Sequence, residues 1–95
     1  MAELLNESDL ETAMAGLDGW QLDDNGTGLL RTFKFTDFNA AFGFMARCAL
    51  FAEKTNHHPE WSNVYNKVEV RLSTHDAGGI TRLDVDMAGK MNAYL

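Results

Sequence analysis

Apolar residues recur along this chain with two periods, one of about 3.6 residues and one of two residues, which are typical of an amphipathic helix and a half-buried strand. An opening helix is expected to begin at Ser8, because Glu11 three residues later completes a capping box. A short strand at residues 20–22, a turn at residues 23–26 and a second strand at residues 30–35 then predict a hairpin.

The middle of the chain predicts one long helix. Thr36 or Asp37 can cap its start, and the helix must end near Asn56, because Pro59 disfavours helical geometry in the residue before it. One face of this helix is apolar and is expected to lie on the core. The residues of that face are Phe38, Ala41, Phe42, Met45, Cys48, Ala49 and Ala52.

A second hairpin and a last helix complete the pattern. Residues 60–65 form a third expected strand, and residues 68–73 alternate between apolar and polar side chains, as in a strand with one buried face. Thr81 and Asp84 match the start of a last helix. The order α-β-β-α-β-β-α predicts an α+β fold, a two-layer sandwich whose four-stranded antiparallel sheet carries three helices on one face. We expect residues 1–95 to form this single domain.

The second hairpin is expected to bring distant histidines together. A two-residue turn at residues 66–67 would place Trp61 opposite Leu72 and, further from the turn, His58 opposite His75. Directly paired residues have Cβ atoms about 5 Å apart. The end of the long helix and the start of the last helix lie at the same end of the sheet. We therefore expect all three histidines of the chain to meet there.

These histidines are the main candidates for chemistry. Imidazole gains and loses a proton near neutral pH, so three of them suit proton transfer on a flat polar substrate. The alternatives are a pair stabilised by the helix C-terminus and a zinc site, for which adjacent His57 and His58 on a strand are poorly placed. Other side chains can form the wall of the site, orient a ring or complete a metal site, namely Trp61, Glu53, Asp76 and Asp84.

Composition narrows the range of functions. The chain has 14 acidic residues against 8 Lys and Arg, a net charge of −6 that argues against a nucleic-acid partner. It has no long apolar run that would predict a membrane span, and its first residues lack the basic and apolar regions of a signal peptide. The single cysteine, Cys48, excludes an internal disulfide. We therefore expect a soluble, cytoplasmic protein.

Further phenylalanines on the long helix predict an interface. Phe44 and Phe51 lie on a stripe beside the predicted core face, and Leu50 lies roughly opposite that face. Apolar surface beyond what one core needs usually marks contact with another molecule. We therefore expect a homo-oligomer, either a dimer or a tetramer, through the long helix and the sheet, unless a deep groove on the sheet takes all of these side chains. Tyr65 is expected in the core.

Several residues follow the signature of a known family. They are an acid at Glu53, the run His57-His58-Pro59, an aromatic at Tyr65, then His75 and Asp84. Matching runs surround them at residues 37–45, 63–68 and 72–76. Over residues 8–94 the chain resembles the pterin-4a-carbinolamine dehydratases, and it departs from them at Asn56, where many members carry an acid.

The resemblance implies a reaction and residue roles. The family removes water from 4a-hydroxytetrahydropterin to give the quinonoid dihydropterin. This recycles the cofactor of aromatic amino-acid hydroxylases, phenylalanine hydroxylase above all, with no metal or organic cofactor. His57 and His75 are implied as the general acid–base pair, and His58 is implied to position the pterin and to share in the proton transfer. Substrate contacts are implied for Trp61, Ser73 and Thr74, with support at the rim from Glu53 and Asp84.

The resemblance also implies a second class of function. Some animal members bind and stabilise a dimeric homeodomain transcription factor through the long helix. A non-enzymatic interaction module is therefore the alternative to the dehydratase. The intact histidines favour the enzyme, because partner binding alone would place no demand on three imidazoles.

Overall fold

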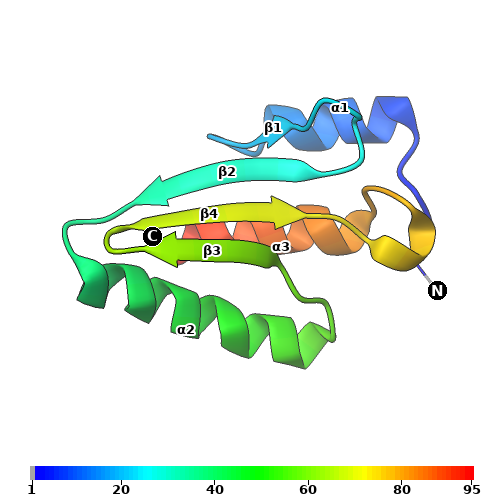
Figure 1. The fold of residues 1–95 in the computed structure, drawn as a ribbon. Helices are drawn as coiled ribbons and strands as arrows, with labels where there is room; N and C mark the ends of the chain where they lie inside the picture. The colour runs from blue at the N-terminus through cyan, green and yellow to red at the C-terminus, as the bar shows by residue number, and fades with distance from the viewer. Residues whose placement is uncertain (1) are drawn as a thin grey trace.

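The fold is a sheet of four strands covered on one face by three helices (Figure 1). The computed structural model describes residues 2–95. In chain order the elements are α1 (Glu7–Ala15), β1 (Gln21–Leu22), β2 (Leu29–Lys34), α2 (Phe38–Thr55), β3 (Glu60–Val64), β4 (Lys67–Leu72), the 3₁₀ helix η1 (His75–Ala77) and α3 (Arg82–Ala93). The predicted order of helices and strands is confirmed, with η1 as an addition.

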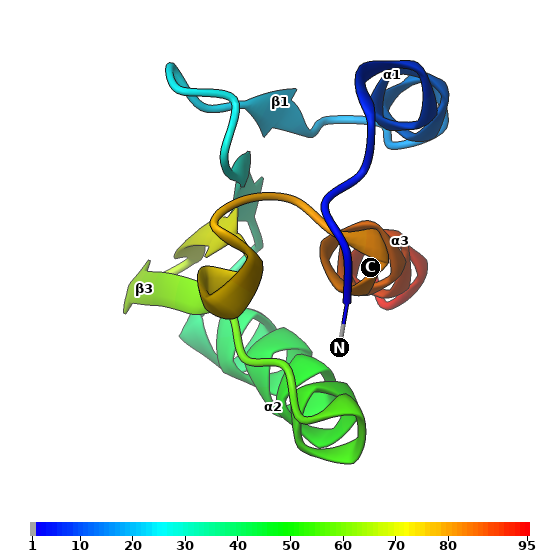
Figure 2. The same ribbon diagram turned by 90° about the vertical axis from the view of Figure 1, so that its right-hand side faces the viewer.

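The sheet is antiparallel throughout, with the strand order β1-β2-β4-β3. Figure 2 shows the molecule from the end of the strands, with α1, α2 and α3 all on one side of the sheet. This arrangement confirms the predicted two-layer α+β sandwich. Because α2 connects β2 to the edge strand β3, β4 can lie between them, and its far end opens toward η1 and α3.

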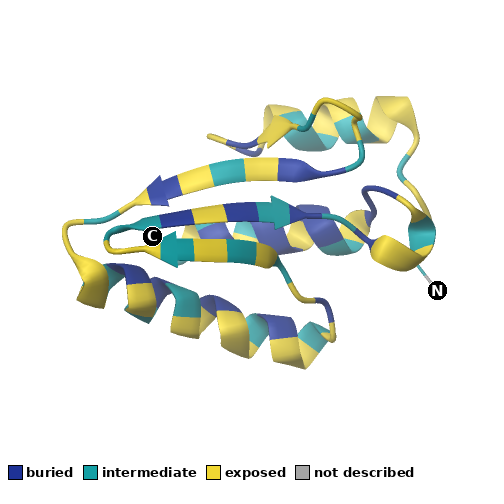
Figure 3. Ribbon diagram, in the orientation of Figure 1, coloured by how far each residue is buried: buried dark blue, intermediate teal, exposed yellow. Residues whose placement is uncertain are grey.

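The core lies between the sheet and the helices. Along β4 the buried side chains Val68, Val70 and Leu72 alternate with more exposed ones, as predicted (Figure 3). Phe33 of β2 packs against Phe44 of α2, with ring centroids 4.7 Å apart. In the described part of the chain, no helix is both long enough and apolar enough to cross a membrane.

The cap of helix α1 lies two residues earlier than predicted. Asn6 is its cap, because the Asn6 side-chain oxygen accepts a hydrogen bond from the Asp9 N–H at 2.8 Å. The predicted capping box at Ser8 is wrong, since Ser8 lies in the first turn and its carbonyl accepts a bond from the Thr12 hydroxyl at 3.1 Å. Asn and Ser cap helices about equally well. The backbone before the helix, which pairs with the segment before α3, selects Asn6.

The core face of α2 is rotated relative to the prediction. Phe44, predicted on a stripe beside the core, is fully buried, and Phe51 also packs against the core. Phe38 and Phe42, predicted in the core, are 49% and 57% exposed and pack on each other, with ring centroids 5.7 Å apart. Phe44 is therefore accommodated between the sheet and α2, and the prediction that Phe44 contributes to an interface is wrong. The large apolar side chains exposed on α2 are Phe38, Phe42 and Leu50.

The β3–β4 hairpin turns one residue earlier than predicted. Trp61 pairs with Val70, where the sequence predicted Leu72. Tyr65 occupies the turn with φ 51, and its side chain is 60% exposed and not in the core. The Asn63 amide fixes this turn by donating to two carbonyl oxygens within it, at 3.1 and 2.8 Å. Because partners shift by two positions, each strand side chain keeps its predicted face.

Candidate active site

The three histidines gather at the end of the sheet where α2 ends and α3 begins. They line a cavity of about 270 Å³. The lining residues are Asn56, His57, His58, Ser73, Thr74, His75, Asp76 and Leu83. The predicted meeting of the histidines is confirmed, although His75 lies in η1 and not on a strand opposite His58.

The end of α2 gives the two adjacent histidines different environments. Asn56 closes the helix in the left-handed conformation, φ 52, which asparagine tolerates better than most residues. The His57 N–H then bonds back to the Ala52 carbonyl at 3.1 Å, as in a common helix ending. After this reversal the His57 side chain is buried and His58 is exposed.

His57 is held by a buried carboxylate. Its Nε2 lies 2.6 Å from Asp84 Oδ1, and the two side chains are 10% and 0% exposed. A carboxylate without a proton only accepts hydrogen bonds, so in that state of Asp84 the His57 Nε2 carries the proton and Nδ1 has none of its hydrogen-bonding capacity used by Asp84. Asp84 Oδ2 accepts two more bonds, from the Thr81 N–H at 2.9 Å and the Thr74 hydroxyl at 2.8 Å. Asp84, expected at the rim, therefore lies in the interior.

His58 has a partner of the same kind at the surface. Its Nε2 lies 2.8 Å from Glu53 Oε1, and the side chains are 55% and 80% exposed. Ion pairs between exposed groups are screened by water and salt, so they hold their members weakly. Glu53 is therefore exposed beside His58 and outside the lining of the cavity, and it leaves His58 able to change its position. Its support of the substrate at the rim stays a prediction.

His75 reaches the cavity from a tight turn after β4. The Thr74 N–H donates to the Gly79 carbonyl at 2.8 Å, and Gly78 closes the turn with φ 77. Glycine adopts this conformation without strain. The two glycines before the last helix therefore build the turn that carries His75, and the strand ends before it.

Two predicted substrate contacts use their hydroxyl protons inside the protein. The Ser73 hydroxyl donates to the Thr27 carbonyl at 2.7 Å, and the Thr74 hydroxyl donates to Asp84. A hydroxyl has one proton and two lone pairs, so each can still accept a bond from a ligand but cannot donate one. Trp61 packs against the core, and its contact with a bound ring stays a prediction.

An ion-pair cluster fixes the loop beside Ser73. Arg71 Nη2 lies 3.0 Å from Asp23 Oδ2, and Arg71 Nη1 lies 2.7 Å from Glu60 Oε2. Burial raises the pKa of the Asp23 carboxyl, but hydrogen bonds from the Thr27 N–H and from Arg71 outweigh it and hold that pKa below its ordinary value. The cluster thus ties the β1–β2 loop to β4, where the Thr27 carbonyl receives the Ser73 hydroxyl.

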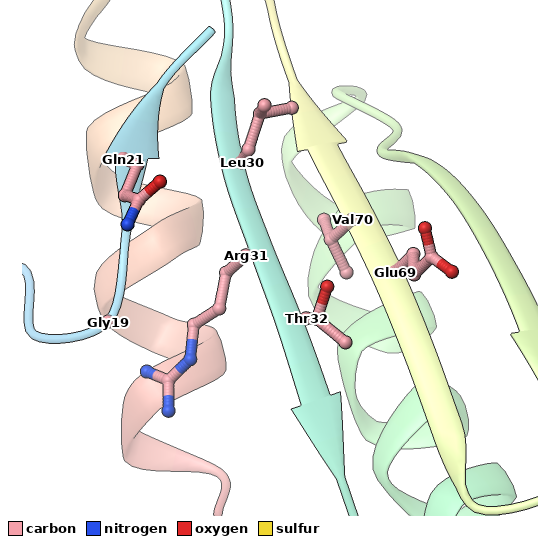
Figure 4. A pocket seen from close by; sticks show the side chains of 7 residues that line it. All are labelled: Gly19, Gln21, Leu30, Arg31, Thr32, Glu69 and Val70. Carbon is pink, nitrogen blue, oxygen red and sulfur yellow. The ribbon is translucent and has the colours of Figure 1, made fainter.

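A larger hollow of about 420 Å³ lies on the sheet face away from the helices. Figure 4 shows Gln21, Thr32 and Glu69 around it, and Arg31 pointing away toward α3, where it donates to Asn92 at 2.6 Å. Its described lining holds no histidine or cysteine. Chemistry, and not size, therefore identifies the histidine cavity as the candidate site. Among the described residues, no three or more His, Cys, Asp or Glu side chains are grouped to hold a metal ion.

Comparisons with known proteins identify the family. The sequence profile described as Pterin 4 alpha carbinolamine dehydratase matches residues 3–94. The chain belongs to the pterin-4a-carbinolamine dehydratase family. Relatives from Brucella ovis and Brucella canis, provisionally named pterin-4-alpha-carbinolamine dehydratases, are each 56% identical over 89 residues, which cover 94% of this chain and 92% of the relative.

A solved structure gives the same result. The crystal structure of a Brucella melitensis protein, described as a transcriptional coactivator/pterin dehydratase, is 56% identical and has a TM-score of 0.92. The match covers 95% of this chain and 96% of that chain. The pterin-4a-carbinolamine dehydratases are hydro-lyases, so the chain is an enzyme that removes water from its substrate.

The sequence did not single out every residue at this site. Leu83 lines the cavity, and the Thr81 hydroxyl lies 2.7 Å from the Thr74 hydroxyl. Both residues belong to the start of α3, which the hairpin argument had already placed at this end of the sheet. Their position in the first turn was therefore the available signal, although Thr81 was interpreted only as a helix cap.

Proposed function

We propose that the chain dehydrates 4a-hydroxytetrahydropterin to quinonoid dihydropterin and water by histidine general acid–base catalysis. The observation that carries this proposal is the convergence of His57, His58 and His75 on one cavity. Membership of the family supports the substrate class. The ordered carboxylate next to His57 supports a chemical role for that ring, since a positioned acid or base must keep one orientation.

The reaction needs two proton transfers on neighbouring atoms. The hydroxyl on C4a leaves as water and takes a proton from an acid. The adjacent ring nitrogen gives its proton to a base, and a double bond forms between that nitrogen and C4a. Each positioned acid or base typically contributes roughly 10² to 10⁴ in rate. The substrate loses only water, and no oxidant or reductant takes part.

The environments of the histidines suggest a division of roles. We assign the base to His57, because its Nε2 proton is held by Asp84 and the buried carboxylate stabilises the imidazolium that forms when Nδ1 accepts a proton. The acid is His75, which is exposed and can be reprotonated from solvent. His58 positions the pterin, and the imidazole of His58 can adjust its orientation because its contact with Glu53 is weak.

The test is the dehydration rate of freshly generated 4a-hydroxytetrahydropterin, followed by ultraviolet absorbance. We expect His57→Ala and His75→Ala to lose roughly 10²- to 10⁴-fold in rate with an unchanged circular dichroism spectrum. Glu69→Gln, on the open face of the sheet, is the matched control and keeps the wild-type rate. A folded wild type that is no faster than buffer would reject the dehydratase.

We further propose where this activity serves. The product is the oxidised form of a hydroxylase cofactor, so the enzyme recycles the pterin used by an aromatic amino-acid hydroxylase such as phenylalanine hydroxylase, in the cytoplasm. Deletion of the chain in its host is expected to lower the yield of tyrosine per pterin supplied. An unchanged yield would show that the enzyme does not recycle the pterin of this hydroxylase.

The exposed apolar side chains of α2 support a homo-oligomer through that helix. Phe38, Phe42 and Leu50 are 49%, 57% and 75% exposed. Analytical ultracentrifugation of the wild type and of Phe42→Ser tests this, with dissociation expected in the variant. The description of the Brucella melitensis relative also includes a transcriptional coactivator. If the wild type is monomeric and a second protein copurifies with it through this surface, a non-enzymatic interaction module becomes the better interpretation.

A further inference from the structure

A chain of buried hydroxyls connects the start of α3 to His57. Thr81 and Asp84 are fully buried, and Thr74 is 8% exposed. The Thr81 and Thr74 hydroxyl oxygens lie 2.7 Å apart, and the Thr74 hydroxyl lies 2.8 Å from Asp84 Oδ2. Asp84 Oδ1 then meets His57 Nε2 at 2.6 Å. No buried side-chain polar atom in the described residues lacks a partner, so the network is complete.

Proton counting gives every bond in this chain a direction. The ionised Asp84 can only accept, so the Thr74 hydroxyl donates its single proton to it. Thr81 must then donate its proton to Thr74, and its free lone pairs accept the Leu83 N–H at 3.2 Å. The bonds therefore run one way, from the N-terminus of α3 through two hydroxyls to the carboxylate that holds His57.

The backbone keeps these groups aligned. The Leu5 N–H donates to the Ile80 carbonyl at 3.0 Å, and the Thr74 N–H donates to the Gly79 carbonyl at 2.8 Å. The Thr81 N–H itself donates to Asp84 Oδ2 at 2.9 Å. Asp84 is thus held at both oxygens and cannot rotate without breaking the helix cap. The same carboxylate starts α3 and orients the ring of His57.

We propose that Thr81 is a positioning residue for the reaction at His57. Its outgoing hydrogen bond fixes the Thr74 proton on Asp84, and Asp84 in turn fixes the Nε2–H tautomer and leaves Nδ1 for proton transfer. The role in catalysis rests on the proposed dehydratase function. A residue that only caps a helix needs an accepting oxygen and no donated bond. The bond from Thr81 to Thr74 is therefore the feature that separates the two roles.

The experiment compares Thr81→Val, which removes the hydroxyl, with Thr81→Ser, which keeps it. We expect Thr81→Val to lower kcat roughly two- to tenfold, the equivalent of one hydrogen bond, with little change in KM. Thr81→Ser is expected to restore the wild-type kcat. Asp37→Ala is the matched control, because it removes the carboxylate that caps α2 by accepting a hydrogen bond from the Ala40 N–H at 2.8 Å. Within the described residues, Asp37 has no hydrogen-bond link to the site. The substitution should lower stability without lowering kcat.

A spectroscopic readout on the folded variants makes the test independent of turnover. Nitrogen-15 NMR of the histidine rings should show wild-type His57 with the proton on Nε2, and a mixture of tautomers in Thr81→Val. A wild type with the proton on Nδ1, or a Thr81→Val variant with unchanged tautomer and kcat, would overturn the positioning role. The Nε2–H tautomer in a wild type without dehydratase activity would support the network and reject the proposed reaction.

Discussion

Two adjacent histidines bind carboxylates through the same ring nitrogen at nearly the same distance, but in opposite environments. His57 lies 2.6 Å from Asp84 with side chains 10% and 0% exposed, and His58 lies 2.8 Å from Glu53 with side chains 55% and 80% exposed. Water can replace a lost partner at the surface but not in the interior. The length of a histidine–carboxylate contact therefore says little about its role until the burial of both groups is known.

The comparison also separates two demands of one active site. In the proposed mechanism the ring of His57 transfers a proton and must keep one orientation, which the buried carboxylate would provide. In the same proposal the ring of His58 positions the substrate and must adjust when it enters, which the exposed carboxylate would permit. The first pair should be sensitive to any change of its partner, and the second should tolerate it.

The largest expected effect comes from replacing the rings themselves. We expect His57→Gln to lower kcat roughly 10²- to 10⁴-fold, because the reaction loses its base. His58→Gln should raise KM and lower kcat at most about tenfold, the equivalent of one hydrogen bond. Steady-state kinetics on 4a-hydroxytetrahydropterin measures both. Equal losses of kcat in the two variants would show that burial does not separate the roles.

The next largest effect comes from replacing the carboxylates. Asp84→Asn should lower the free energy of unfolding by about 3 kcal/mol, because it breaks a buried pair and replaces an oxygen that accepts hydrogen bonds. Glu53→Gln should change it by less than about 1 kcal/mol. Urea titration of both variants and the wild type measures the difference. A stability loss in Glu53→Gln as large as in Asp84→Asn would contradict the comparison.

A third carboxylate gives an intermediate case. The side chain of Asp23 is 15% exposed, that of Arg71 is 33% exposed, and the folded pKa of Asp23 lies below its ordinary value. The stability from this pair is therefore complete above the unfolded pKa of about 3.9 and is lost as the pH falls through the folded pKa. The stability difference between wild type and Asp23→Asn should therefore be constant near pH 6 and should narrow as the pH falls below about 4 toward about pH 3. A constant difference in urea titrations across this range would disprove it.

The smallest expected effect concerns salt. The pair of Glu53 and His58 is exposed, so at low salt the free energy of unfolding of Glu53→Gln should differ from that of the wild type by roughly a few tenths of a kcal/mol. Raising the NaCl concentration should remove most of this difference. The loss in Asp84→Asn should stay almost unchanged, because ions in solution do not reach the buried pair. Parallel urea titrations at low and high salt measure both. If salt reduces the two losses alike, the burial of Asp84 does not govern its pair.

The fold was largely predictable because it depends on period and on caps. The alternation along β4 and the caps at Asp37 and Thr81 are local signals, and the structure keeps them. The phase of α2 was not predictable, because apolar side chains occupy more than one of its faces. The rings of Phe33 in β2 and of Phe35 just after it select Phe44 for the core and leave Phe42 exposed. The hairpin turn was missed because a side-chain amide, and not periodicity, fixes it.

The candidate site divides in the same way. The convergence of the histidines follows from topology, so it survived the shift of the hairpin. The burial of Asp84 and the link from Thr81 through Thr74 depend on side-chain hydrogen bonds between different elements. The sequence pattern of a helix cap does not indicate that the second carboxylate oxygen of Asp84 contacts His57. This is why Asp84 was expected at the rim and was found in the interior.

The hydrogen bond between His57 and Asp84 joins residues 27 positions apart and encloses the whole β3–β4 hairpin. During folding, the chain must close this loop before the bond can form, whereas helices and the hairpin itself depend on nearer contacts. A chain with native strands and an undocked α3 would have no positioned imidazole. Recovery of turnover during refolding should therefore lag behind formation of the β3–β4 hairpin, and it reports when the last helix docks.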